Sequence, residues 1–145
     1  MNTADVNVLV AASRSDHPNH EVAAQWLGSV FDSEESSEQL VLLSTVVTGF
    51  LRIVTHPRVF VEPTPVVHAW KFLDALLSRQ SVQVLETVTS WDLFREITVD
   101  RDLAGNAIPD AWIASQVRHQ HLRLATFDRG FKKLLRPSML RLLAA

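Results

Sequence analysis

The sequence predicts an α/β fold with a central, mostly parallel sheet. Short apolar runs typical of buried strands alternate along the chain with longer segments whose apolar residues recur at helical spacing. This alternation is the pattern of strand–helix–strand units, which place parallel strands side by side. The 145 residues contain no internal repeat and no shift in composition that would divide them, so we expect one domain over residues 1–145.

The first predicted strand and helix lie near the N-terminus. Residues 6–12 form an apolar run, broken only by Asn7, that predicts a buried strand or a strand that continues into a helix. Residues 16–31 place their apolar side chains at helical spacing. The acidic, serine-rich residues 32–39 predict a surface loop, and the wholly apolar start of residues 40–44 predicts a second buried strand.

Two helices follow. Residues 45–57 (TVVTGFLRIVTHP) predict a helix that ends near Pro57, because the residue before a proline avoids helical geometry. Pro63 and Pro65 precede residues 66–79, where a broad apolar face recurs at helical spacing. Proline is favoured at the start of a helix, so we expect this second helix to begin there.

The rest of the chain continues the alternation. Residues 81–86 (SVQVLE) alternate in polarity like a short strand, and the amphipathic residues 90–103 predict a helix that stops near Gly105. The remaining predicted elements are a helix over residues 109–119, a strand over residues 122–126 and a short basic helix from Gly130.

Composition excludes several classes of protein. Hydrophobic residues make up 47% of the chain and charged residues 21%, which is neither a disordered nor a fibrous composition. No apolar run approaches the roughly 20 residues that span a bilayer, and the N-terminus lacks a basic leader, so we expect a soluble cytoplasmic protein. The chain has no cysteine, which leaves carboxylates and histidines as its metal ligands.

Charge is distributed unevenly along the chain, although the net charge is only -2. One acid, Asp128, lies between Arg118 and the C-terminus, and the basic residues of that segment are Arg118, Arg123, Arg129, Lys132, Lys133, Arg136 and Arg141. This asymmetry suits a polyanion held beside a metal site. The alternative is a solvated basic helix.

Three aspartates stand at predicted strand ends or helix starts. Asp5 enters the first apolar run, where a buried charge requires a partner or a metal; the alternative is that it caps a helix turn with Asn7. Asp110 follows a proline and opens a helical pattern, where an acid is also favoured by the exposed N–H groups and the helix dipole. Asp128 directly follows a predicted strand and has the alternative of capping the last helix.

Taken together, the three acids predict a metal site. The carboxyl ends of parallel strands meet at one edge of a sheet, so the three side chains are expected to converge there. Mg²⁺ and Mn²⁺ prefer oxygen ligands, and clustered carboxylates repel one another unless a cation lies between them. A cation there would activate water and neutralise a phosphodiester, which favours metal-dependent phosphodiester hydrolysis over three unrelated caps.

Four motifs in this order resemble the VapC toxin family of PIN-domain ribonucleases: DVNVLVAA, TGFLRIVTHPRVF, GNAIPDAWIAS and LATFDRGF. The resemblance covers residues 5 to about 133. It implies a three-layer α/β/α sandwich and a toxin of a type II toxin–antitoxin system that cleaves cellular RNA with Mg²⁺ or Mn²⁺. It also implies neutralisation by a VapB-type antitoxin, in a homodimer or a toxin–antitoxin hetero-oligomer. By motif position, the family's acids match Asp5, Asp110 and Asp128.

The chain departs from the family pattern at two glycines. Many PIN domains carry a glutamate on the helix of the second motif, and Gly49 stands at that position here. The late motif often has a further acid two residues after its first, and here that residue is Gly130. Three acids favour one firmly bound metal ion over two.

Five other residues are candidates for supporting roles. Arg52, Arg129 and Lys132 are expected to bind the RNA substrate, with ion pairing as the alternative for Arg52. Asn7 and Thr126 are expected to orient the carboxylates or a metal-bound water, with local hydrogen bonding to the backbone as the alternative. The apolar helices over residues 16–31 and 62–79 are possible sites for antitoxin or homodimer contact.

Two other functions fit the sequence less well. The missing glutamate supports a catalytically weak or inactive PIN-like module that binds RNA or protein. A small α/β phosphohydrolase or phosphate-receiving domain is disfavoured, because the chain has no glycine-rich phosphate loop and no lysine placed late after a strand.

Overall fold

The strands form one parallel sheet in the order β3-β2-β1-β4-β5. The computed structural model describes residues 1–32, 39–86 and 90–144. Within these ranges the strands are β1 (Asn2–Ala4), β2 (Leu40–Leu43), β3 (Val82–Leu85), β4 (Arg123–Thr126) and β5 (Leu140–Leu142). The mostly parallel sheet expected from the sequence is therefore confirmed.

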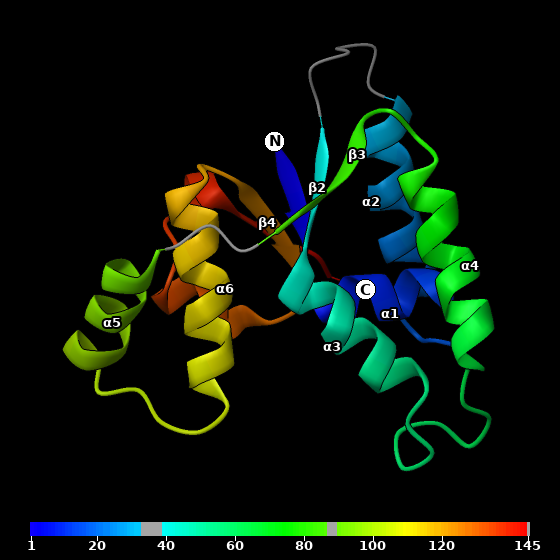
Figure 1. Ribbon diagram of the computed structural model, residues 1–145, viewed down its shortest axis with the longest axis horizontal. Helices are drawn as coiled ribbons and strands as arrows, with labels where there is room; N and C mark the ends of the chain where they lie inside the picture. The colour runs from blue at the N-terminus through cyan, green and yellow to red at the C-terminus, as the bar shows by residue number, and fades with distance from the viewer. Residues whose placement is uncertain (33–38, 87–89, 145) are drawn as a thin grey trace.

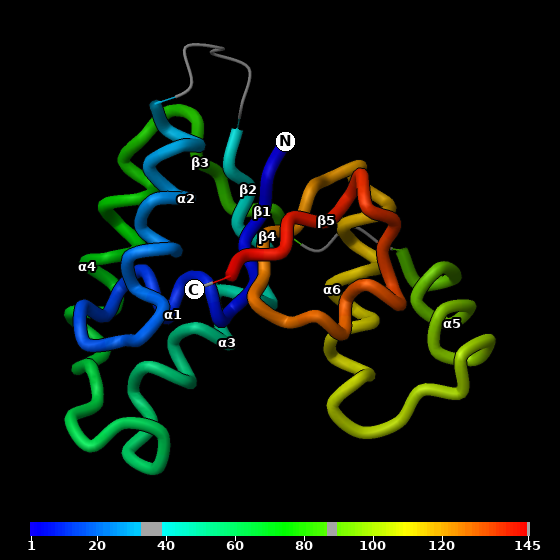
Figure 2. Tube along the Cα trace, turned by 180° about the vertical axis from the view of Figure 1, so that it is seen from behind, coloured from blue at the N-terminus to red at the C-terminus, as the bar shows by residue number. Residues whose placement is uncertain are grey.

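Helices cover both faces of this sheet. They are α1 (Val6–Ser13), α2 (His20–Asp32), α3 (Ser44–Val54), α4 (Val66–Leu77), α5 (Trp91–Asp100) and α6 (Ala107–His119), with the 3₁₀ helices η1 (Arg129–Lys133) and η2 (Pro137–Met139). Figures 1 and 2 show α1 to α4 on one side of the strands and α5 and α6 on the other. The chain steps outward from β1 to β3 and then returns to the other side of β1. Since such crossovers are right-handed, the reversal moves the later helices to the opposite face.

The apolar run at residues 6–12 is helical, so the buried strand expected there is wrong. The strand is β1, which ends immediately before Asp5, and α1 begins at Val6. Residues 8 to 11 are all buried in the core. Packing on this face therefore outweighs the preference of β-branched residues for strands.

Other element boundaries differ by a few residues. Helix α6 begins at Ala107, two residues before the expected start, and α5 ends at Asp100, before Gly105 is reached. The basic segment after Asp128 forms a short 3₁₀ helix, and β5 was not expected from the sequence at all. The loop expected at residues 32–39 lies mostly outside the described residues.

Burial on both faces of the sheet explains why β2 is continuously apolar. All four residues of β2 are buried, as expected of a central parallel strand covered on both faces. Phe50 and Phe131 are the largest fully buried side chains, and they lie on α3 and η1. No helix in the described part of the chain is long and apolar enough to cross a membrane.

The strand order reverses at β1. The chain proceeds from β1 to β2 and β3 on one side, whereas β4 pairs with β1 on the other. In open parallel sheets, ligands bind in the crevice at the carboxyl ends of the strands that flank such a switch point. Asp5 directly follows β1 and Asp128 closely follows β4, so the fold places both acids at this crevice.

The burial of β2 at the centre of the sheet predicts how much stability is lost when one of its side chains is shortened. We expect Leu42→Ala, in the middle of β2, to lower the free energy of unfolding by about 2–5 kcal/mol, because it leaves a cavity in a fully buried position. Val61→Ala, at a fully exposed position, is the control and should change it by less than about 0.5 kcal/mol. Urea unfolding measures both, and equal effects would contradict this placement of the core.

Candidate active site

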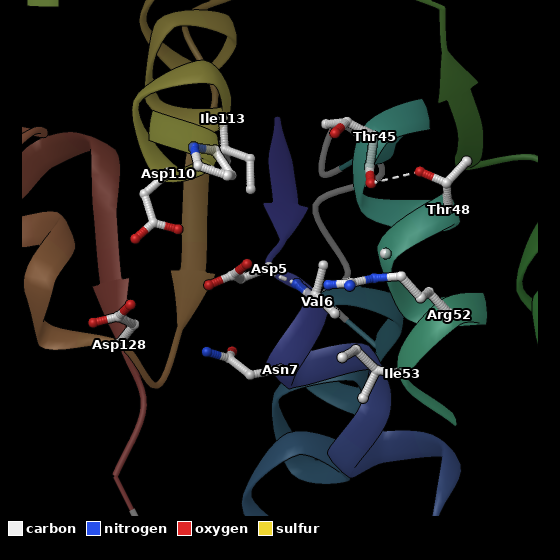
Figure 3. Close-up of a pocket in the computed structure, with 12 residues that line it drawn as sticks. Asp5, Val6, Asn7, Thr45, Thr48, Arg52, Ile53, Asp110, Ile113 and Asp128 are labelled. Atoms are coloured by element: carbon white, nitrogen blue, oxygen red, sulfur yellow. Dashed lines mark hydrogen bonds between the residues drawn. The ribbon is translucent and has the colours of Figure 1, made fainter. Parts of the chain in front are cut away.

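A cavity of about 610 Å³ lies at the carboxyl ends of β1 and β4 (Figure 3). Its lining includes three carboxylates from separate elements: Asp5 after β1, Asp128 after β4 and Asp110 in the first turn of α6. Figure 3 shows these carboxylates around one common space. The structure thus brings together the three acids singled out in the sequence.

Asp5 is held rigidly. Its side chain is 6% exposed, and it caps the start of α1 by accepting a hydrogen bond at Oδ1 from the backbone N–H of Val6 at 2.7 Å. Its other oxygen, Oδ2, accepts a hydrogen bond from the hydroxyl of Thr126 at 2.6 Å. The carboxylate of Asp5 therefore caps α1 and lines the cavity at the same time, and one hydrogen bond to each oxygen holds it in place.

The hydroxyl of Thr126 is hydrogen-bonded to three residues at the floor of the site. It donates to Asp5 and accepts hydrogen bonds from the side-chain amide of Asn7 at 3.3 Å and from the backbone N–H of Asp128 at 2.9 Å. A hydroxyl has one donor and two acceptor positions, so this one is fully used. Asn7 also accepts from the backbone N–H of Phe127 at 3.3 Å. These bonds tie the end of β4 to the start of α1.

Asp128 is exposed and caps the start of η1, which is the capping role considered for it from the sequence. Its Oδ1 accepts a hydrogen bond from the backbone N–H of Gly130 at 2.7 Å. A Cβ atom added at Gly130 would lie only 3.0 Å from the same oxygen. A side chain at residue 130 would therefore require the carboxylate of Asp128 to shift by a few tenths of an ångström.

Asp110 is the least constrained of the three carboxylates. It is partly buried in the first turn of α6, yet its side chain accepts no hydrogen bond from the described residues, and α6 has no side-chain cap. Helix capping, the alternative considered for this residue, is absent. Its carboxylate is free to bind a ligand in the cavity.

The negative charges of the three acids act on one another in the cavity. Burial, followed by the negative charges of Asp128 and Asp5, raises the pKa of Asp110 from 3.8 to about 6. Burial also raises the pKa of Asp5, against the hydrogen bonds from Thr126 and Val6, and the charge of Asp128 adds to the increase. Concentrated negative charge of this kind attracts a cation.

The donor set fits a hard divalent cation whose coordination is completed by water. In the described part of the chain, no group of three or more histidine, aspartate or glutamate side chains forms a ready-made metal site. The available donors are nevertheless all carboxylate oxygens around an open cavity. Mg²⁺ commonly binds one or two carboxylates directly and keeps several waters, so an incomplete cage is no obstacle.

The wall opposite Asp110 comes from α3. It contributes Thr45, Thr48, Gly49 and Arg52, whose spacing places them along one side of that helix. Arg52 and Gly49 were singled out from the sequence, whereas the two threonines were not. Their spacing from Arg52 places them on the same side of a helix, and this is the sequence signal that could have identified them.

The other two expected RNA-binding residues lie outside this cavity. Arg129, at the start of η1, is exposed and does not line it. Lys132 lines two smaller cavities instead, one of about 320 Å³ and one of about 300 Å³. The structure therefore places only Arg52, of the three basic candidates, beside the carboxylates.

The raised pKa of Asp110 predicts a pH effect on stability. Because the folded state holds this proton more tightly than the unfolded state, stability should fall as the pH rises from about 4 through about 6. We therefore expect the melting temperature, measured in a chelating buffer, to fall less over this pH range for Asp110→Asn than for the wild type. Asp92→Asn, which changes an exposed acid in the first turn of α5, should follow the wild type. Identical pH profiles for all three proteins would contradict the raised pKa of Asp110.

Comparison with known proteins gives the family. The profile of the PIN domain matches residues 4–136. Ribonuclease VapC43 of Mycobacterium tuberculosis is 38% identical over 133 residues, which are 91% of this chain and 88% of that protein. The profile match includes the segments that carry the four sequence motifs.

Two solved structures share the fold. The VapBC2 complex of Rickettsia felis, bound to a DNA fragment from its promoter, superposes with a TM-score of 0.69 at 17% identity, over 99% of this chain and 98% of that chain. VapC20 of M. tuberculosis, a toxin that cleaves the sarcin–ricin loop, gives a TM-score of 0.64 at 14% identity, over 92% and 94% of the two chains. The three-layer sandwich is thereby confirmed, and the chain belongs to the PIN-domain family, among the VapC ribonucleases.

Proposed function

We propose that this protein is the toxin of a VapBC-type toxin–antitoxin system and cleaves RNA at the cavity between β1, β4 and α6. The convergence of Asp5, Asp110 and Asp128 in that cavity is the observation that carries the proposal. Membership of the VapC ribonucleases supplies the endonucleolytic reaction. We take residues 1–145 as one PIN domain that acts in the cytoplasm.

A divalent cation, Mg²⁺ or Mn²⁺, is the cofactor that these donors suit. Asp5, Asp110 and Asp128 would hold it, directly or through water. When bound, such an ion supplies an acidified water and offsets negative charge on a phosphodiester.

The protein's own groups prepare this site in three ways. Thr126 and the N–H of Val6 fix the two oxygens of Asp5, which holds this carboxylate in place at the cavity. Asn7 accepts a hydrogen bond from the backbone N–H of Phe127, directly after β4, and Thr126 accepts one from the N–H of Asp128. These two bonds set the position of Asp128. The unbonded carboxylate of Asp110 can adjust to the ligand without breaking a hydrogen bond within the protein.

Basic side chains near the C-terminus form a second feature that supports RNA binding. The cavity of about 300 Å³ is lined by the cationic residues Arg101, Arg118, Lys132, Lys133 and Arg136. None of them pairs with a carboxylate in the described part of the chain. Arg118 lies on α6, which also carries Asp110, and Lys132 and Lys133 lie on η1, which Asp128 caps. An RNA backbone held here would therefore contact two of the elements that position the active site.

A VapB-type antitoxin is the proposed protein partner. The solved VapBC2 complex supports this choice through its shared fold. Helix α4, within the segment 62–79 suggested by the sequence, exposes Val66, Val67 and Trp70 at its start. This apolar surface is a candidate contact for the antitoxin or for a second copy in a homodimer or hetero-oligomer.

Removing one carboxylate tests the reaction. We expect Asp110→Asn to lower RNA cleavage at least about 10²-fold, because it removes a charged ligand at a position whose side chain makes no hydrogen bond. Asp5→Asn should be as inactive but less stable, since an amide keeps only one acceptor oxygen for Val6 and Thr126.

The measurement is sequencing of RNA ends after induced expression, together with cleavage by the purified proteins. Asp92→Asn, in the first turn of α5, is the matched control and should cleave like the wild type. Wild-type cleavage by a folded Asp110→Asn protein would exclude this cavity as the active site.

The basic cavity predicts a dependence on salt. In an Asp110→Asn background, which prevents cleavage, we expect Arg118→Ala and Lys133→Ala each to weaken binding of a labelled single-stranded RNA of mixed sequence. Each should reduce the slope of log affinity against log salt by about 0.7, the value for one lost phosphate contact. Lys71→Ala, an exposed change on α4, should leave the slope unaltered. Slopes equal to the control would place the RNA elsewhere.

A further inference from the structure

The α3 wall of the active-site cavity carries a positive charge where the opposite walls carry negative charges. No acid occurs in α3, and the residues that it contributes are two threonines, Gly49, Arg52 and Ile53. The three carboxylates therefore occupy only one part of the lining. Any ligand in the cavity contacts acids on one side and a guanidinium on the other.

A fourth carboxylate is sterically excluded from this wall at Gly49. A Cβ atom added there would lie 2.8 Å from Cγ2 of Val6, a distance that real Cβ contacts essentially never show. Val6 is the first residue of α1, and its N–H is hydrogen-bonded to the carboxylate of Asp5. A side chain at residue 49 would therefore require the side chain of Val6 to move, and this contact between α1 and α3 uses the absence of a side chain at Gly49.

Arg52 is the charged residue that α3 contributes to this cavity. Figure 3 shows its side chain extending from α3 across the cavity toward Asp5 and Val6. Although it lines a cavity with three carboxylates, it forms no ion pair with any described acid. A guanidinium in this position offers a planar pair of donors to an incoming phosphate.

We infer that the site binds a single divalent cation at its three aspartates and that Arg52 supplies the second positive charge by contacting the scissile phosphate. This inference rests on the function proposed above. Three ionised carboxylates and one divalent cation leave the site with one negative charge. Arg52 neutralises this charge before the anionic phosphodiester of RNA enters.

The hydrolysis itself requires no proton transfer from Arg52. The oxygen of one water bonds to phosphorus as one P–O ester bond of RNA breaks. One proton of that water ends on the released hydroxyl group, and the other ends on the new phosphate monoester. Arg52 stays protonated throughout and stabilises the charge on the phosphoryl oxygens, as donors preorganised for a transition state do.

Calorimetric titration with Mn²⁺ tests the number of ions. We expect one bound Mn²⁺ per chain in the wild type and also in Arg52→Ala, where the affinity for Mn²⁺ should not weaken because a nearby positive charge has been removed. RNA cleavage by Arg52→Ala should nevertheless fall about 10²–10³-fold. Arg52→Lys, which keeps the charge without the planar pair of donors, should recover part of the loss. Arg58→Ala, an exposed change that lines none of the cavities described above, is the control and should match the wild type.

A paired substitution tests why only one ion binds. In Val6→Ala/Gly49→Glu the shortened residue 6 makes room for a carboxylate on α3, so this protein should bind a second Mn²⁺. Its cleavage should also depend less on Arg52 when Arg52→Ala is added. Gly49→Glu alone should unfold at a lower temperature than the wild type, because the new side chain would collide with the intact side chain of Val6.

The outcomes separate the two proposals. Absence of both Mn²⁺ binding and cleavage in the wild type would overturn the proposed function. Two Mn²⁺ ions in the wild type, or undiminished cleavage by Arg52→Ala, would overturn the role of Arg52 and leave the nuclease assignment intact. A folded Val6→Ala/Gly49→Glu protein that still binds one ion would also count against the inference. If the pair does not fold, the titration and cleavage of Arg52→Ala decide alone.

Discussion

The parallel pairing of β1 with β4 is the constraint on which the site depends. Register between these strands aligns Ala4 with Ala125, and the N–H of Asp5 continues the ladder to the carbonyl of Ala125 at 2.9 Å. One residue further, the Thr126 hydroxyl reaches the carboxylate of Asp5. Acids from opposite ends of the sequence thus come together through backbone hydrogen bonds, which do not depend on either acid. Loss of the charge on one acid should therefore leave the fold standing, whereas loss of this register would remove the site.

The site holds negative charge that works against folding. Asp110 and Asp5 both have pKa values raised mainly by burial, which means that ionising them in the folded protein is unfavourable. At Asp5 two short hydrogen bonds offset part of this unfavourable free energy of ionisation. At Asp110 no hydrogen bond from the described residues offsets it. A bound cation would relieve the remaining repulsion. Stability and function are thus opposed at this cavity, as is common where a protein prepares a binding site.

Most of the secondary structure followed from local pattern. The helices at Ser44–Val54 and Val66–Leu77 and the strand at Leu40–Leu43 were predicted within a few residues, because proline positions and continuous apolar runs mark them locally. The run at residues 6–12 was harder, since a fully buried helix and a fully buried strand have the same unbroken apolar sequence. Strand β5 was missed because three residues are too short to show a period. Its partner β4 supplies the pairing that makes it a strand.

The sequence by itself determined the fold class and the family and singled out the three acids as a candidate site, because apolar periodicity and short motifs are properties of neighbouring residues. Only the tertiary structure decided how those acids are held and what faces them. The contact between Val6 and Gly49 joins two helices that are distant in sequence, so no local pattern reveals that it excludes a fourth acid. The same holds for Lys132, which the structure places outside the cavity, and for Arg52, which it places inside. Which basic residue lies beside the carboxylates depends on how helices pack across the sheet, and that packing is set by the whole core at once.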